Sequence, residues 1–231
     1  MTQTPTTTKD RRVGRPRTTV VLTALLAVVI IGGLGLIIAQ RGNGTAGLAS
    51  SIEPDDVSAQ IASGFINAYG SFDADEAASY LAPGADLSAM DGGQEEWQAA
   101  IDWQKAQGFE LILDSCEAGE TISAGTIVRC PFDYQGIHSK ELGLGPYSGS
   151  RFEIVVLDGE ITRAVMLFEF RFNGFSSQVW EPFAQWVSEN YPDDAAVMYT
   201  DDSHDYENLT DESIRLWALH AREYADQVKQ G

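Results

Sequence analysis

Residues that build metal and nucleophile sites are scarce in this 231-residue sequence. It has only two cysteines, and its three histidines, His138, His204 and His220, lack the spacing of metal ligands. It contains no GxSxG segment and no glycine-rich phosphate loop, so no motif supports hydrolase or nucleotide chemistry. The sequence therefore predicts no metal site and no cofactor.

Basic residues are scarce beyond the first 50 positions. Residues 1–50 hold six Lys/Arg and one Asp, whereas residues 51–231 hold nine Lys/Arg against 33 Asp/Glu, a formal charge of −24. A body with this charge repels phosphates and anionic membrane surfaces. We therefore expect no nucleic-acid partner.

A long apolar run does occur, at residues 20–39. Its 20 residues contain no charge, and at about 1.5 Å per residue they span the roughly 30 Å core of a bilayer. Five basic residues precede the run and only Arg41 follows, so the positive-inside rule places the N-terminus in the cytoplasm. A cleaved signal peptide, the alternative, has a shorter apolar segment. The sequence predicts a single-pass protein of the cell membrane with an extracytoplasmic C-terminal domain.

Composition divides the chain into segments. We expect a disordered cytoplasmic tail over 1–18, a transmembrane helix over 19–40 and a flexible linker over 41–54. A folded domain over 55–190 and an acidic connector with a C-terminal helix over 191–231 follow.

The two cysteines, Cys116 and Cys130, lie in strand-like segments separated by a polar stretch. A hairpin that pairs them places Ala118 opposite Val128 and Glu120 opposite Thr126. Outside the cytoplasm a disulfide is favoured over two buried thiols. The sequence therefore predicts a Cys116–Cys130 bond.

The periodicity of apolar residues predicts an α+β domain. Helical spacing covers five segments: 55–69, 75–81, 95–107, 179–190 and 211–229. Alternation predicts four strands: 109–116, 125–135, 150–157 and 160–173. Asp158-Gly159 is a two-residue hairpin turn, which pairs Val156 with Ile161 and Phe152 with Val165. Both faces of this hairpin carry apolar residues, which requires a bulge or cover on both sides.

Two segments resemble the nuclear transport factor 2-like superfamily, in particular its SnoaL-like polyketide cyclases and ketosteroid isomerases. They are FINAYGSFDADEAASYLAPGADL (65–87) and VVLDGEITRAVMLFEF (155–170). The whole chain is similar to uncharacterised membrane-anchored actinobacterial members. The resemblance implies a cone-shaped domain in which three helices pack against a curved antiparallel sheet, with additional C-terminal helices.

The resemblance also implies a pocket between sheet and helices. We expect eight residues to line it: Phe65, Tyr69, Trp97, Trp103, Phe168, Glu169, Phe170 and Arg171. Glu169 and Arg171 have two open interpretations, a polar pocket floor or an ion pair on the strand surface.

Isomerase chemistry needs a general base and a tyrosine that stabilises an oxyanion. Alignment with the isomerase-like pattern places Phe65 at the tyrosine, and a phenyl ring cannot donate a hydrogen bond. It places Ala89 at the base, or Asp91 if two residues are inserted, in which case Tyr69 or Tyr80 would be the donor. We interpret Asp91 as a solvated turn residue.

The acidic segment 189–212 has oxygen ligands at several positions of a calcium-binding loop, among them Glu207. Tyr206 stands where that loop requires glycine, so we interpret the segment as a solvated connector. The sequence thus predicts a non-catalytic domain that binds a small hydrophobic ligand or a protein partner. The alternative is an isomerase-like or SnoaL-like enzyme acting on a hydrophobic ring compound, and a homodimer stays open.

Overall fold

The structure is a computed structural model that describes residues 54–200, 204 and 206–230. The predicted tail, membrane-spanning run and linker, apart from Pro54, lie outside these residues. Within the described part, no helix combines the length and the apolar character needed to cross a membrane.

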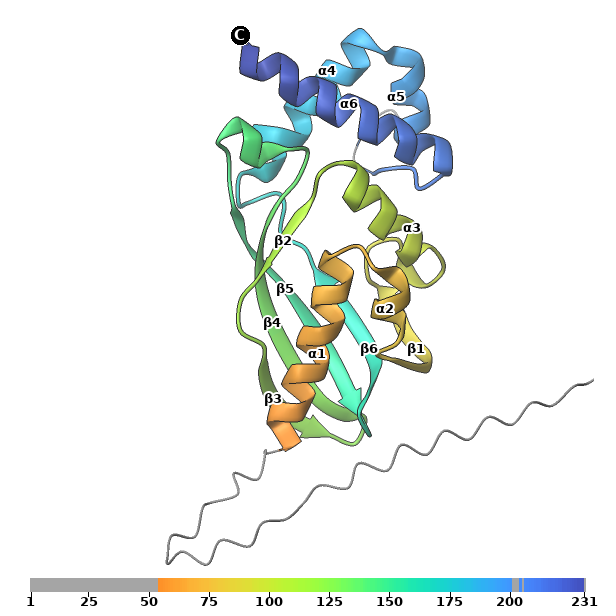
Figure 1. Ribbon diagram of the computed structural model, residues 1–231, viewed down its shortest axis with the longest axis vertical. Helices are drawn as coiled ribbons and strands as arrows, with labels where there is room; N and C mark the ends of the chain where they lie inside the picture. Colours follow the sequence, from red (N-terminus) through yellow and green to blue (C-terminus); the bar gives the residue numbers. More distant parts are fainter. Residues whose placement is uncertain (1–53, 201–203, 205, 231) are drawn as a thin grey trace, which may run out of the picture. The chain divides into compact units, whose positions relative to one another are not determined.

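Three helices lie on one face of the sheet (Figure 1): α1 (Pro54–Gly70), α2 (Ala74–Ala78) and α3 (Gly93–Ala106). Their positions confirm the helices expected from periodicity. Phe65, Ile66 and Tyr69 of α1 are fully buried, as the helical spacing requires. Gly108, two residues after the end of α3, has a φ of 72°, which glycine adopts without strain.

The sheet has six strands in the order β1-β6-β5-β4-β2, and β3 also pairs with β4. The strands are β1 (Leu81–Ala89), β2 (Glu110–Leu113), β3 (Glu117–Ile122), β4 (Gly125–Gln135), β5 (Tyr147–Leu157) and β6 (Glu160–Leu167). The α+β class is confirmed.

The expectation of a purely antiparallel sheet is wrong, because β1 pairs with β6 in parallel. Sequence patterns missed β1 since it contains Pro83 and Gly84, which signal a chain break. An edge strand tolerates them, because one side of its backbone has no strand partner.

The predicted disulfide between Cys116 and Cys130 is present, with the two Cα atoms 4.2 Å apart. Ala118 faces Val128 as expected. Thr121, not Glu120, faces Thr126, because the register shifts within β3.

The hairpin of β5 and β6 turns at Asp158 and Gly159, whose φ angles are 52° and 88°. Val156 faces Ile161 as predicted, but Phe152 faces Met166 rather than Val165. The register shift leaves Thr162 as an extra residue, so Ile161 and Ala164 can both be fully buried. The strand expected over 160–173 ends at Leu167.

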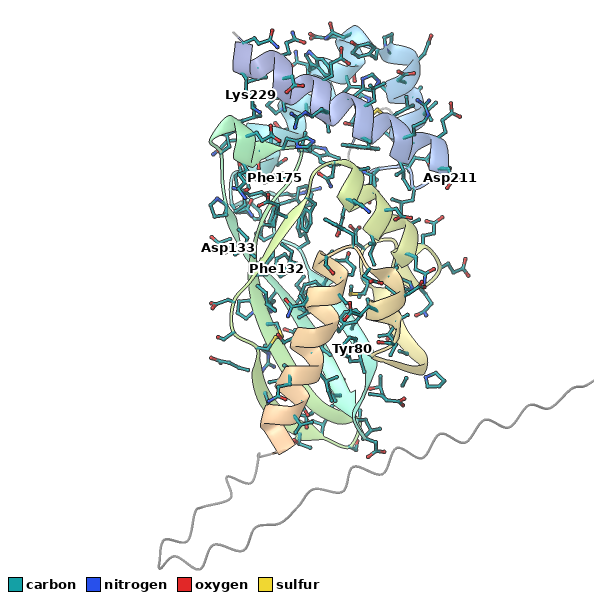
Figure 2. The ribbon with its side chains drawn as sticks, in the orientation of Figure 1. Tyr80, Phe132, Asp133, Phe175, Asp211 and Lys229 are labelled. Atoms are coloured by element: carbon teal, nitrogen blue, oxygen red, sulfur yellow. A yellow bond between two sulfur atoms is a disulfide. The ribbon has the colours of Figure 1, made fainter. Side chains whose placement is uncertain are left out.

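The last part of the chain gathers at one end of the sheet (Figure 1). We call residues 176–230 the C-terminal cap. It contains the π-helical turn η2 (Ser176–Trp180), α4 (Glu181–Asn190), α5 (Pro192–Met198) and α6 (Asp211–Gln230). Phe175 lies where the cap meets the sheet (Figure 2).

Aromatic side chains join the cap to α3. Trp217 of α6 is fully buried, and its ring centroid lies 5.5 Å from that of Trp103 on α3 and 5.5 Å from that of Trp180. Contacts of this kind stabilise beyond the buried area alone. The cap and α3 therefore share one core.

Candidate functional site

A cavity of about 190 Å³ is bounded by α3, the segment after β6 and the C-terminal cap. Seven of its eleven lining residues are aromatic. They are Trp103, Phe109, Phe168, Phe170, Phe175, Trp180 and Tyr206, and the other four are Asp91, Gln104, Gln107 and Glu207. An apolar wall with a few polar groups is typical of a small-molecule site.

Separate elements bring the two carboxylates to this cavity. Asp91 lies in the turn between β1 and α3. Glu207 is placed by a short antiparallel ladder, in which it bridges Tyr199. Backbone hydrogen bonds from Thr200 to Tyr206 (3.0 Å) and from Asn208 to Met198 (2.8 Å) close this ladder on both sides.

Gln104 connects Asp91 with Tyr69. Its Nε2 donates to Oδ2 of Asp91 (3.0 Å) and to the hydroxyl of Tyr69 (2.9 Å). An ionised carboxylate only accepts hydrogen bonds, so the amide nitrogen must face Asp91. The Gln104 Oε1 is consequently directed elsewhere.

Two buried polar atoms of the lining residues have no hydrogen-bond partner among the described residues. They are Oε1 of Gln104 and Nε1 of Trp103, whose residues are 2% and 6% exposed. A buried donor or acceptor without a partner costs about 1–3 kcal/mol. Both atoms belong to residues that line the cavity, so a bound molecule is a candidate partner for each of them.

Burial perturbs the ionisable groups of the cavity. It raises the pKa of Glu207 to about 7, and the neighbouring Asp91 carboxylate adds to the rise. Burial also raises the pKa of Asp91, against the opposing hydrogen bond from Gln104. The pKa of Tyr69 is raised by burial and by Asp91. Near neutral pH the cavity can thus hold one ionised and one protonated carboxyl group.

Four residues predicted from the sequence as pocket-lining or base candidates line the cavity: Asp91, Trp103, Phe168 and Phe170. The interpretation of Asp91 as a solvated residue is wrong. Asp91 does lie in a turn, but its carboxylate is hydrogen-bonded to the buried Gln104. Tyr69 lies behind the lining and reaches it through Gln104.

Phe65 and Trp97, expected in the pocket, are core residues outside its lining. Phe65 is fully buried in α1, with its ring centroid 6.3 Å from that of Tyr69. Trp97 precedes Trp103 on α3 by six residues, which is roughly 9 Å along a helix. That separation takes Trp97 away from the cavity.

Glu169 and Arg171 follow the end of β6, and neither lines the cavity of about 190 Å³. Oε1 of Glu169 accepts the backbone N–H groups of Arg171 (3.0 Å) and Phe172 (2.9 Å). The Arg171 guanidinium lies 5.4 Å from the ring centroid of Phe170. Arg171 lines a second, open groove of about 560 Å³, which shares Phe170 and Trp180 with the cavity.

Sequence patterns gave no role to Gln104 and Gln107, and they named Glu207 only as an oxygen ligand of a calcium-binding loop. The two glutamines did carry a signal, since they follow Trp103 on the apolar side of a predicted helix, where polar residues are unusual. Glu207 carried no signal for a position in the cavity, because it stands in an acidic segment of the kind that is usually exposed to solvent. Across residues 54–200, 204 and 206–230, no group of three or more His, Cys, Asp or Glu could hold a metal ion.

No family model matches this sequence, and no curated protein matches it. Similar solved structures include a nuclear transport factor 2-like protein of unknown function from Cytophaga hutchinsonii (15% identity, 48% of this chain and 88% of that chain, TM-score 0.33). A candidate polyketide cyclase from Xanthomonas campestris is also similar (12%, 51% and 93%, TM-score 0.38). A third is an LEH-like epoxide hydrolase from M. tuberculosis (16%, 58% and 97%, TM-score 0.38). We therefore infer function from the residues of the site alone.

Proposed function

We propose that this domain adopts the nuclear transport factor 2-like fold and binds a compact ring compound in the cavity between α3 and the C-terminal cap. The observation that carries the proposal is the pair of buried atoms without partners, Trp103 Nε1 and Gln104 Oε1, on two lining residues. The volume supports a small ligand. An apolar cavity of about 150 Å³ holds benzene, and this one is about 190 Å³.

Loss of the Trp103 donor tests this proposal. One-ring compounds with an oxygen acceptor, with 2-phenylethanol as the probe, should bind the full-length chain and show saturation transfer in ligand-observed NMR. Trp103→Phe keeps the aromatic surface but removes the N–H, and should weaken binding about tenfold, the effect of one hydrogen bond. Trp186→Phe is the matched control, because its N–H bonds Gln227 on the surface. Equal affinities of the two variants would contradict the assignment.

A second candidate function is acid–base catalysis, which two observations favour. Asp91 and Glu207 share the cavity with raised pKa values. Tyr69, one helical turn after Phe65, has a hydroxyl linked to Asp91 through Gln104. A carboxylate can take a proton from carbon, and a protonated acid can stabilise the resulting oxyanion.

Cyclohex-3-en-1-one is a suitable substrate, because its single ring matches the cavity. Isomerisation removes a proton from C2 and returns a proton to C4, which gives the conjugated cyclohex-2-en-1-one without any other reactant. A catalyst should accelerate it above the buffer rate, and Asp91→Asn should abolish the acceleration. Glu160→Gln, an exposed carboxyl at the β5–β6 turn, should retain it. A wild-type rate in Asp91→Asn would exclude this mechanism.

The cellular setting that we propose depends on the sequence alone. The apolar run at 20–39 and its basic flank support an anchor with the domain outside the cytoplasm. Binding of a protein partner and formation of a homodimer are likewise proposals.

A further inference from the structure

We infer that the ligand of the α3–cap cavity is an organic cation, a protonated amine carried on a compact ring. This inference rests on the proposed binding function and names its substrate class. The charges, the aromatic rings and the unpartnered atoms of the lining support it.

The charge of the lining excludes anions and favours cations. Two carboxyl groups, from Asp91 and Glu207, face one cavity, and no Lys or Arg stands among the described residues that line it. A bound anion would meet like charge from two directions in a poorly solvated site. A cation placed between the carboxylates would instead reduce their mutual repulsion.

The aromatic walls suit the same ligand. Trp103 and Trp180 both line the cavity, with their ring centroids 6.4 Å apart and their planes inclined by 70°. Phe168 contacts both Phe109 (6.3 Å) and Phe170 (6.4 Å) on the strand side. Aromatic faces attract cations through the ring quadrupole, most strongly where water is excluded. Rings combined with carboxylates are the usual surroundings of a bound ammonium group.

The two unpartnered atoms indicate which kind of amine the cavity binds. Oε1 of Gln104 needs a donor, which the N–H of a primary or secondary ammonium group supplies and a quaternary one lacks. Nε1 of Trp103 needs an acceptor, which an oxygen on the ligand supplies. A ring that carries both an amine and an oxygen satisfies both atoms.

The other ionisable groups near the cavity do not cancel the negative charge of its lining. Tyr69 faces Asp91 from α1, and its raised pKa keeps it neutral. Arg171, Glu181 and His204 line the adjoining groove instead. Arg171 stacks on Phe170, outside the cavity lining.

A charge series on one ring tests the inference on the unaltered full-length chain. Phenethylamine, 2-phenylethanol and phenylacetate are similar in size but carry positive, zero and negative charge at pH 8. Titrations followed by tryptophan fluorescence should show the amine binding at least tenfold tighter than the alcohol, and no binding of the acid. The affinity for the amine should rise between pH 6 and pH 8, as Glu207 loses its proton.

Substitutions of the two carboxyl residues test whether they cause the preference for the amine. Asp91→Asn and Glu207→Gln should each weaken the amine at least tenfold and change the affinity for the alcohol less than twofold. Glu160→Gln should alter neither.

Outcomes separate this inference from the proposed function. If the alcohol binds as tightly as the amine, or if both carboxyl variants bind the amine normally, the cation assignment is wrong while the cavity remains a binding site. If none of the three compounds binds, the binding function fails and the cation assignment fails with it.

Discussion

Replacing Glu207 by Gln should stabilise the protein at alkaline pH, although it removes a charged side chain. In the folded protein the pKa of Glu207 rises to about 7, from an ordinary value of 4.5. The folded state therefore holds the proton more tightly than the unfolded chain does. Gln keeps the shape of the protonated acid but never ionises.

The magnitude follows from the two pKa values. The stability contributed by Glu207 is fully present below pH 4.5 and is lost as the pH rises through about 7. The difference corresponds to at most about 3 kcal/mol of unfolding free energy. Because burial is the first cause and Asp91 the next, Asp91→Asn should move the midpoint of this loss to lower pH without returning it to 4.5.

Urea denaturation of the full-length chain at pH 5 and pH 8, followed by tryptophan fluorescence, measures this effect. The stability of Glu207→Gln relative to wild type should increase by up to about 3 kcal/mol between the two pH values. Glu160→Gln, which changes an exposed carboxyl, controls for the overall charge. A Glu207→Gln difference that is the same at both pH values would refute the burial and the charge coupling described for this site.

Four further predictions concern the disulfide, the core between the cap and α3, the cavity and the membrane topology expected from the sequence. Replacing Cys116 and Cys130 together by Ser opens a loop of 14 residues and should lower the unfolding free energy by about 3 kcal/mol in urea. Trp217→Ala should lower it by about 3–5 kcal/mol in the same assay, because the ring is fully buried between the cap and α3. A β,γ-unsaturated ketosteroid should not isomerise above the buffer rate, measured by enone absorbance, since four rings exceed a cavity of about 190 Å³. External protease should remove the domain from intact cells stripped of outer layers, and its protection would contradict the predicted topology.

The fold could be predicted where the chain repeats a pattern over several turns or strands. Phe65 and Ile66 belong to an apolar helix face, and Asp158-Gly159 marks a hairpin, so these elements follow from local physics. Residues 81–89 form a strand because they pair with the edge of β6. This pairing is not visible in the local sequence, where Pro83 suggests a chain break. The short α5 was missed for a similar reason, since seven residues are too few for a clear helical period.

Only part of the site could be predicted from the sequence. Asp91 could be identified as a candidate base by alignment with a family pattern. Its hydrogen bond to Gln104 of the next helix could not be predicted in this way. The place of Glu207 in the cavity could not be predicted, because it depends on the ladder with Tyr199, which no spacing in the sequence encodes. Sequence patterns report on neighbours along the chain, whereas this pair of carboxylates is made by the docking of the cap.

That docking has an energetic consequence for the cap itself. Desolvation of the Glu207 carboxylate, and next the charge of Asp91, oppose the packing of Glu207 over the cavity once it ionises, by up to about 3 kcal/mol. A cation at 100 times its dissociation constant returns about 2.7 kcal/mol to the folded state. The two quantities are nearly equal, so an occupied cavity at pH 8 should hold the cap about as firmly as an empty one at low pH. Ligand affinity and the stability of the C-terminal cap are then linked through the same two side chains, Asp91 and Glu207.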